Sequence, residues 1–115
     1  MNQILPSTTD KIKAETSKAS VVLFMKGNPI FPMCGFSAKT AGVLSHLGVD
    51  YHSVDVLQDP ELREGIKAYA NWPTIPQVYV KGEFIGGCDI IEDMFETGEL
   101  AELLHSRGIA ISQKP

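Results

Sequence analysis

The sequence predicts one α/β domain in which a mixed four-stranded sheet is flanked by helices. Residues 21–25 form an unbroken apolar run, which is typical of a central strand covered on both faces. A helical pattern and a strand of alternating polarity follow, which indicates a parallel βαβ unit. Further along, Lys81-Gly82 separates two short apolar runs and predicts an antiparallel hairpin. The chain of 115 residues is long enough for a single layered core.

A short helix is predicted before the first strand, over residues 7–18. Its apolar anchors are few, but Ile12 and Ala19 are seven residues apart and fall on one face. The candidate N-cap residues at its start are Ser7, Thr8, Thr9 and Asp10.

The first strand is followed by a loop, residues 27–32, that two prolines make stiff. Ile30 and Phe31 in this loop leave two interpretations open. They are either directed into the core or form an exposed contact surface. A second helix is expected from Cys34 to about Leu47, ended by the glycine that follows.

Residues 49–56 alternate in polarity and predict a half-covered edge strand. Asp59 then offers a helix cap and Pro60 a first helical residue. The apolar stripe of this third helix consists of Leu62, Ile66 and Tyr69. The hairpin that follows is expected to join strands at residues 77–80 and 83–86.

Two helices are predicted after the hairpin. Cys88-Asp89 begins the first, which ends at Thr97-Gly98, and the second runs from Glu99 to about Ser106. The inward residues of the first are expected to be Ile91, Met94 and Phe95. This order of elements is that of the thioredoxin fold. We therefore expect one domain over residues 1–115, with residues 1–18 as a helical extension and residues 109–115 as a loose tail.

Composition excludes several classes of function. The formal net charge of −4 gives no basic face for non-specific nucleic-acid binding, and no apolar run approaches the ~18 residues of a membrane span. Residues 1–20 lack a signal-peptide core, and their acidic Asp10 and Glu15 make a poor transit peptide. Two cysteines, Cys34 and Cys88, are too few for a secreted disulfide framework, so a cytoplasmic location is expected.

Cys34 is placed between the loop and the start of the second helix. The unpaired N–H groups and positive dipole end of a helix favour a thiolate there, and Lys26 adds a nearby positive charge. Such a cysteine has a pKa of roughly 3.5–7.5 in place of about 8.5. A thiolate is both a nucleophile and a soft metal ligand. Ser37 stands where a two-cysteine redox motif would carry its second thiol, so a disulfide within the motif is excluded.

Three separated blocks resemble the monothiol glutaredoxins of the Cys-Gly-Phe-Ser class. They are Lys26-Gly27-x-Pro29-x-x-Pro32-x-Cys34-Gly35-Phe36-Ser37, then Trp72-Pro73-Thr74-Ile75-Pro76-Gln77, then Gly86-Gly87-Cys88-Asp89. They agree in order and spacing, and the resemblance covers nearly the whole chain apart from residues 1–10 and the tail.

The resemblance implies a glutathione site with Cys34 as the catalytic thiol. Lys26 and Arg63 would bind the glycine carboxylate, and a cis bond before Pro76 would let the backbone of Ile75 pair with the peptide. The start of the last-but-one helix would bind the γ-glutamyl end, with the Cys88 N–H on the carboxylate and Asp89 on the amine. The implied glutathione-binding residues are Lys26, Cys34, Phe36, Arg63, Ile75, Pro76, Cys88 and Asp89.

Some of these residues also have an ordinary structural interpretation. Arg63 is equally well a surface residue of its helix, and Asp89 is expected to act as an N-cap in any case. Trp72 and Pro73 are expected to pack at a helix end rather than touch the ligand. The Cys88 thiol is either inert or resolves an oxidised Cys34.

Two functions follow from one well-placed thiolate. A [2Fe–2S] cluster needs four thiolate-type ligands, which two copies of Cys34 and two glutathiones would supply. We expect a cluster-bridged homodimer that carries iron–sulfur clusters to apo acceptor proteins, with weak thiol–disulfide exchange. A glutathione-dependent monothiol oxidoreductase is the alternative. The resemblance also implies a BolA-like partner. A histidine-ligated metal is not expected, because the histidines, His46, His52 and His105, are scattered.

Overall fold

The computed structural model describes residues 5–112 and contains one four-stranded sheet in the order β2-β1-β3-β4. Strand β1 pairs with β2 in parallel and with β3 antiparallel, and β3 pairs antiparallel with β4. The strands are β1 (Val21–Met25), β2 (His52–Asp55), β3 (Gln77–Val80) and β4 (Glu83–Gly86). This is the mixed sheet of the thioredoxin fold, as the sequence predicts.

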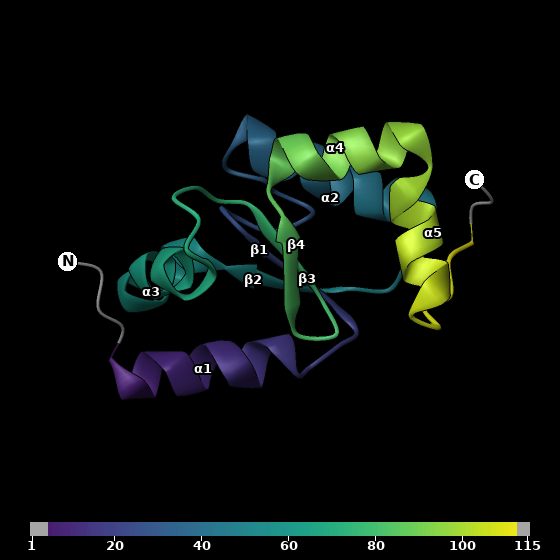
Figure 1. Ribbon diagram of the computed structural model, residues 1–115. Coiled ribbons are helices and arrows are strands. Elements are labelled where there is room, and N and C mark those ends of the chain that lie inside the picture. Colours follow the sequence, from purple (N-terminus) through teal and green to yellow (C-terminus); the bar gives the residue numbers. More distant parts are fainter. Residues whose placement is uncertain (1–4, 113–115) are drawn as a thin grey trace.

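Helices cover both faces of the sheet. Figure 1 shows α2 and α4 side by side on one face, with α5 at the end of α4, and α1 and α3 on the other face. The helices are α1 (Pro6–Thr16), α2 (Gly35–Leu47), α3 (Pro60–Ala70), α4 (Cys88–Thr97) and α5 (Glu99–Ser106), with a 3-10 turn at Val56–Gln58. Among the described residues, no helix has the length and apolar character that crossing a bilayer requires.

Strand β1 is the centre of the core. All five of its residues are fully buried. Val21, Leu23 and Met25 face the core under α2, α4 and α5, whereas Val22 and Phe24 face the core under α1 and α3. Because both faces are covered, the strand is apolar at every position rather than at alternate ones.

Several predicted boundaries hold and two shift. The hairpin strands match the prediction, and both turn residues, Lys81 and Gly82, have the positive φ that a tight two-residue turn requires. Helix α1 starts earlier than predicted, at Pro6, with Leu5 as its N-cap and no side-chain cap. The polar residues 7–10 therefore lie inside the helix, because proline is already suited to its first position.

The second strand is shorter than predicted at both ends. Residues 49–51 lead into β2 without belonging to it, and the chain turns into the 3-10 helix after Asp55. The Asp55 carboxylate accepts a hydrogen bond from the Leu57 N–H at 3.0 Å, which caps that turn.

The expectation of a loose C-terminal tail is wrong for residues 109–112. Ile109 and Ile111 pack against the core under α2 and α4. The Ser112 N–H donates to the Leu47 carbonyl at 3.0 Å, beside the left-handed Gly48 that ends α2. These contacts join segments far apart in sequence, so no local pattern reveals them. The rest of the predicted tail lies outside the described residues.

Candidate functional site

The thiol of Cys34 lies at the N-terminus of α2, where Cys34 is the N-cap residue in an extended conformation. The loop before it folds back on the end of β1. The Met33 N–H donates to the Lys26 carbonyl at 2.9 Å, and Gly27 takes a positive φ of 85° where a Cβ would lie 2.5 Å from the Phe31 carbonyl. This return brings the backbone of Lys26 beside the start of α2.

The pKa of Cys34 is lowered, and backbone donors are the main cause. The Ser37 N–H makes the largest contribution, and the Phe36 N–H adds to it against the opposing effect of partial burial. The charge of Lys26 and the Ser37 hydroxyl lower the pKa further. The thiol is therefore a partly exposed, thiolate-favouring group at a helix start.

Ser37 connects the thiol to the end of β1. Its side chain is fully buried, and its hydroxyl oxygen accepts a hydrogen bond from the Lys26 N–H at 3.0 Å. The same hydroxyl lowers the pKa of Cys34. The residue that replaces a second cysteine is thus part of the structure that supports the thiolate.

Four exposed apolar side chains, which we call the apolar collar, flank Cys34 in sequence. They are Ile30, Phe31, Met33 and Phe36, with exposed fractions of 81%, 72%, 68% and 58%. The interpretation that Ile30 and Phe31 point into the core is wrong. The loop exposes them because the Asn28 side-chain oxygen accepts the N–H groups of both residues, at 2.9 and 2.8 Å, and so closes a tight turn at the surface.

A groove of about 190 Å³ lies between the loop before β3 and the start of α4. It brings together five predicted ligand-binding residues from three parts of the chain: Phe36, Ile75, Pro76, Cys88 and Asp89. The Ile75-Pro76 peptide bond is cis, as expected. The other residues that line the groove are Trp72, Thr74, Gly87 and Ile90.

Trp72 has a larger role than the sequence indicates. Its backbone N–H donates to the Lys67 carbonyl at 3.0 Å and so closes the end of α3, as expected of a packing residue. Its ring also lines the groove and lies 5.7 Å from the Phe84 ring. A Cβ on Gly87 would lie only 2.9 Å from the Trp72 indole nitrogen. The glycine pair before Cys88 is the sequence signal for that close approach.

The expectation that Asp89 caps α4 is wrong. The N-cap residue is Gly87, there is no side-chain cap, and Asp89 lies in the first turn as an exposed acidic residue. A carboxylate in that position still favours the positive end of the helix. The uncapped N–H groups of the first turn remain available to a ligand at the groove.

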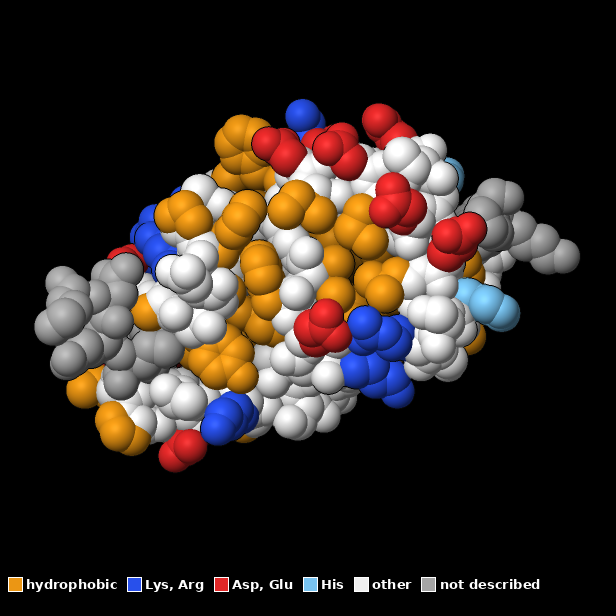
Figure 2. All heavy atoms as spheres, in the orientation of Figure 1, with side chains coloured by type: hydrophobic (Ala, Val, Ile, Leu, Met, Phe, Trp, Pro, Cys, Tyr) orange, Lys and Arg blue, Asp and Glu red, His pale blue; other side chains and the backbone are white. Residues whose placement is uncertain are grey.

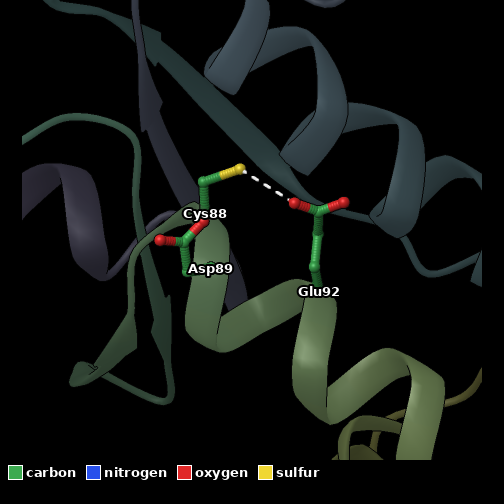
Figure 3. Close-up of side chains that lie close together, drawn as sticks. All are labelled: Cys88, Asp89 and Glu92. Carbon is green, nitrogen blue, oxygen red and sulfur yellow. Dashed lines mark hydrogen bonds between the residues drawn. The ribbon is translucent and has the colours of Figure 1, made fainter.

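Cys88 also lies at a helix start, but it differs from Cys34 in burial and in the direction of its pKa shift. It is 8% exposed, and burial raises its pKa, as do the hydrogen bond and charge of Glu92. Figure 3 shows the Cys88 thiol and the Glu92 carboxylate pointing toward one another, 3.5 Å apart. Both cysteines are free thiols in this structure, and Cys88 is held as a protonated donor.

Cys88, Asp89 and Glu92 form the one group of three potential metal-ligating side chains among residues 5–112, with ligand atoms within 4.8 Å of one another. The protonated thiol makes this a poor site for a soft metal ion. The histidines lie outside any such group in the described part of the chain. His52 contacts Glu15 at 3.0 Å and His46 packs edge-on against Phe95.

The two residues predicted to bind the glycine carboxylate, Lys26 and Arg63, lie outside the groove lining. Lys26 is half-buried next to the thiol, and Arg63 is half-buried in the first turn of α3. The Arg63 Nε atom is buried and has no hydrogen-bond partner among the described residues. A nitrogen without exposed surface cannot itself meet a ligand, so this feature does not distinguish a ligand-binding Arg63 from a surface residue of α3.

The acidic residues of this region gather on α4. Figure 2 shows acidic side chains along the edge of the molecule formed by α4, above hydrophobic side chains that run across the centre of the same face. The acidic residues of α4 are Asp89, Glu92, Asp93 and Glu96. Of these four, Asp89 lines the groove and places one carboxylate on its α4 side.

Comparison with known proteins supports the resemblance. Residues 21–85 match the glutaredoxin family model. The chain is 53% identical over 97 residues to glutaredoxin 4 of Pasteurella multocida, covering 84% of this chain and 89% of that protein. It is 58% identical over 96 residues to the mitochondrial monothiol glutaredoxin-5 of Saccharomyces cerevisiae, covering 81% of this chain and 64% of that longer protein.

The fold has a similar counterpart among solved structures. The solution structure of a monomeric truncated mutant of Trypanosoma brucei 1-C-Grx1 superimposes with a TM-score of 0.82 at 41% sequence identity. The match covers 93% of this chain and 96% of that one, so it includes helix α1 and the region after β4, which the family model leaves out.

Proposed function

The chain belongs to the monothiol glutaredoxin family, and from this premise we propose that it binds glutathione beside Cys34 and carries a [2Fe–2S] cluster. The cluster is the cargo, bridged between two protomers by the Cys34 thiolate of each and by the thiolates of two glutathiones. The observation that carries the proposal is the low-pKa, partly exposed thiol of Cys34 with a buried serine, Ser37, in place of a second cysteine.

The donor set of one protomer supports this stoichiometry. A [2Fe–2S] cluster is held by four thiolate-type ligands. Cys34 offers one thiolate, whereas Cys88 is buried, protonated and hydrogen-bonded to Glu92. The remaining ligands therefore come from a second copy and from glutathione.

The groove supports glutathione as the co-ligand. It combines the cis Ile75-Pro76 loop, which offers unpaired backbone groups to a peptide, with the uncapped N-terminus of α4, which suits a carboxylate. Lys26 and Arg63 offer positive charge for the second carboxylate. The apolar collar supplies a surface that a second protomer would cover.

The proposal includes partners and a compartment. The expected partners are a second copy of the chain, a BolA-like protein and apo iron–sulfur acceptor proteins. A reducing compartment such as the cytoplasm fits, because both the Cys34 thiolate and glutathione need to stay reduced.

Glutathione-dependent thiol–disulfide exchange is the second candidate function. The lowered pKa of Cys34 favours it, since a thiolate attacks a mixed disulfide directly. Turnover by an efficient enzyme, at about 10 s⁻¹ or more, in the reduction of a glutathionylated peptide would favour this function over the carrier.

Anaerobic reconstitution with iron, sulfide and glutathione tests the carrier function. Visible charge-transfer absorption is expected only when glutathione is present, and it should elute with a dimer on size exclusion. A coloured monomer formed without glutathione would contradict the ligand count.

The two cysteines provide matched variants for the same experiment. Cys34→Ser should abolish the colour, whereas Cys88→Ser should leave most of it, because the Cys88 thiol is protonated and turned toward Glu92. Equal loss in both variants would show that the ligand assignment is wrong.

A further inference from the structure

Gln77 is a fully buried polar residue that the proposed function leaves unexplained. It is the first residue of β3 and pairs with Phe24 of the central strand. Its side chain is 0% exposed. A buried amide needs hydrogen-bond partners, so those partners indicate what Gln77 holds in place.

The Gln77 amide nitrogen holds the loop that forms one wall of the groove. Nε2 donates to the Trp72 carbonyl at 3.3 Å and to the Thr74 carbonyl at 3.2 Å. Within residues 5–112, residues 73–76 make no backbone–backbone hydrogen bond of their own. The loop is therefore held by a side chain beneath it rather than by the sheet.

Tyr79 fixes the orientation of this amide. It lies two residues along β3, on the same face of the strand, and its hydroxyl donates to Gln77 Oε1 at 3.0 Å. Tyr79 is 1% exposed and packs against Phe24, with ring centroids 5.4 Å apart. With Oε1 engaged by Tyr79, the two amide hydrogens face the two carbonyls, and every polar atom of the amide is satisfied.

We propose that Gln77 is a positioning residue for glutathione, acting through the Trp72–Pro76 loop that its two hydrogen bonds hold against the groove. The inference rests on the proposed binding of glutathione in that groove. Gln77 lies beneath the loop, so it touches neither the ligand nor the thiol. Its effect is to keep the backbone around the cis Ile75-Pro76 bond in the one arrangement that a peptide can pair with.

The two donated hydrogen bonds and the one accepted from Tyr79 require a side-chain amide at position 77. A methionine has a similar length but no donor, so it would leave two carbonyls unpaired. A glutamate ionised at this position would place a carboxylate, which only accepts hydrogen bonds, against two carbonyl oxygens that also only accept them. When protonated it would donate to one of them, and burial raises the pKa of a carboxyl group so placed. A glutamate variant should therefore regain part of the function as the pH falls.

The experiment measures the apparent dissociation constant for reduced glutathione, without oxygen, in wild type and variants at pH 7.5 and pH 6. The fluorescence of Trp72, the single tryptophan of the chain, is the readout because its ring lines the groove. Gln77→Met should weaken binding about 10-fold at both pH values. Gln77→Glu should weaken binding at least as much at pH 7.5 and regain several-fold at pH 6, relative to wild type at each pH.

Tyr79→Phe is the matched control. It removes the partner of Oε1 and lowers stability but keeps both donor bonds to the loop, so glutathione affinity should change by less than about 3-fold. The pH profile of Cys34 alkylation should be unchanged in all three variants, because the thiol lies on α2. A shifted pH profile of Cys34 alkylation in Gln77→Met would overturn the inference that Gln77 acts only through the loop.

Three other outcomes would also overturn the inference. The first is unchanged glutathione affinity in Gln77→Met. The second is equal loss in Gln77→Met and Tyr79→Phe, since the amide would then act through stability alone. The third is a Gln77→Glu variant without pH-dependent recovery, which decides the question even if Gln77→Met does not fold. If wild type itself binds no glutathione, the proposed function fails and this inference fails with it.

Discussion

At Cys34, backbone N–H groups lower the thiol pKa more than the ammonium of Lys26 does. The sequence places both kinds of group near the thiol but does not rank them. The helix start fixes the N–H groups of Phe36 and Ser37 by its geometry, whereas Lys26 is a half-buried side chain whose charge solvent partly screens. The reactivity of Cys34 is therefore mainly a property of where α2 begins.

A Lys26→Ala variant tests this ranking. The pH profile of Cys34 alkylation should shift to higher pH, because one positive charge that favours the thiolate is lost, but its midpoint should stay below the ordinary thiol value of about 8.5. The measurement is the rate of iodoacetamide reaction across pH, in a Cys88→Ser background.

Lys81→Ala, at the exposed hairpin turn, is the matched control and should leave the profile unchanged. A midpoint for Lys26→Ala at or above the ordinary thiol value would assign the lowered pKa to the lysine instead of the backbone.

At the scale of elements, the sequence predicts best what neighbouring residues decide. The hairpin strands match because Lys81-Gly82 specifies the turn locally, and α3 matches because Asp59 accepts the Leu62 N–H as a cap. The structure contradicts the predicted cap of α4, since the extended Gly87, which follows the end of β4, is the N-cap residue. That placement depends on the contact of Gly87 with Trp72, which is fifteen positions away in sequence.

In the candidate site, too, some residues are predictable from the sequence and others are brought together only by the fold. The position of Cys34 at a helix start follows from the residues around it, whereas the cis bond before Pro76 is predicted from the family resemblance. Four lining residues, Trp72, Thr74, Gly87 and Ile90, are not among the predicted ligand-binding residues, because the groove exists only when the loop before β3 packs beside α4. Thr74 had a usable signal in its place next to Ile75-Pro76, whereas Ile90 had none.

Ser37 joins two elements, the end of β1 and the start of α2, and its replacement tests both roles of the position. Ser37→Cys should raise turnover of a glutathionylated peptide, coupled to glutathione reductase, because it supplies a thiol that can resolve a mixed disulfide at Cys34. It should also lower the free energy of unfolding by about 1–3 kcal/mol, because sulfur is a weak acceptor for the Lys26 N–H.

The matched control is Ser37→Ala, which loses the same hydrogen bond without gaining a thiol. It should show the stability loss but no rise in turnover. A similar rise in both variants would mean that the serine restrains activity through structure and that no resolving thiol is involved.

Helix α1 lies outside the family match at residues 21–85 yet belongs to the core. Ile12 is fully buried between α3 and the sheet, and Lys11 pairs with Asp59, the cap of α3, at 2.9 Å. The pair is largely exposed and contributes little. The apolar contact of Ile12 is therefore the main attachment of the helix.

Ile12→Ala should lower the free energy of unfolding by about 2–5 kcal/mol, because it leaves a cavity under a helix with few other apolar anchors. Lys13→Ala, on the exposed side of the same helix, should change it by less than about 0.5 kcal/mol. Denaturant unfolding of both variants provides the measurement. Equal small effects would mean that α1 is only loosely attached.

In the whole molecule, the reactive thiol and the contacts of the C-terminal segment lie at opposite ends of α2. The helix has 13 residues and is therefore about 20 Å long. Cys34 is at its start, while Leu47 at its end accepts the Ser112 N–H. The groove, the collar and the thiol all lie toward the start. The stability supplied by residues 109–112 should therefore be separable from the function of the site.

The double variant Ile109→Ala/Ile111→Ala tests this separation. Both side chains are half-buried against the core, so their loss should lower the free energy of unfolding by roughly 2 kcal/mol in total, measured by denaturant unfolding. The Cys34 alkylation profile and glutathione affinity should remain at wild-type values, because the helix start is fixed by Ser37 and the loop rather than by the chain end. Ala110→Ser, at the exposed position between them, is the control for general disturbance of the segment. A shift in the alkylation midpoint of the double variant, with none in Ala110→Ser, would show that α2 transmits a change at its end to the thiolate at its start.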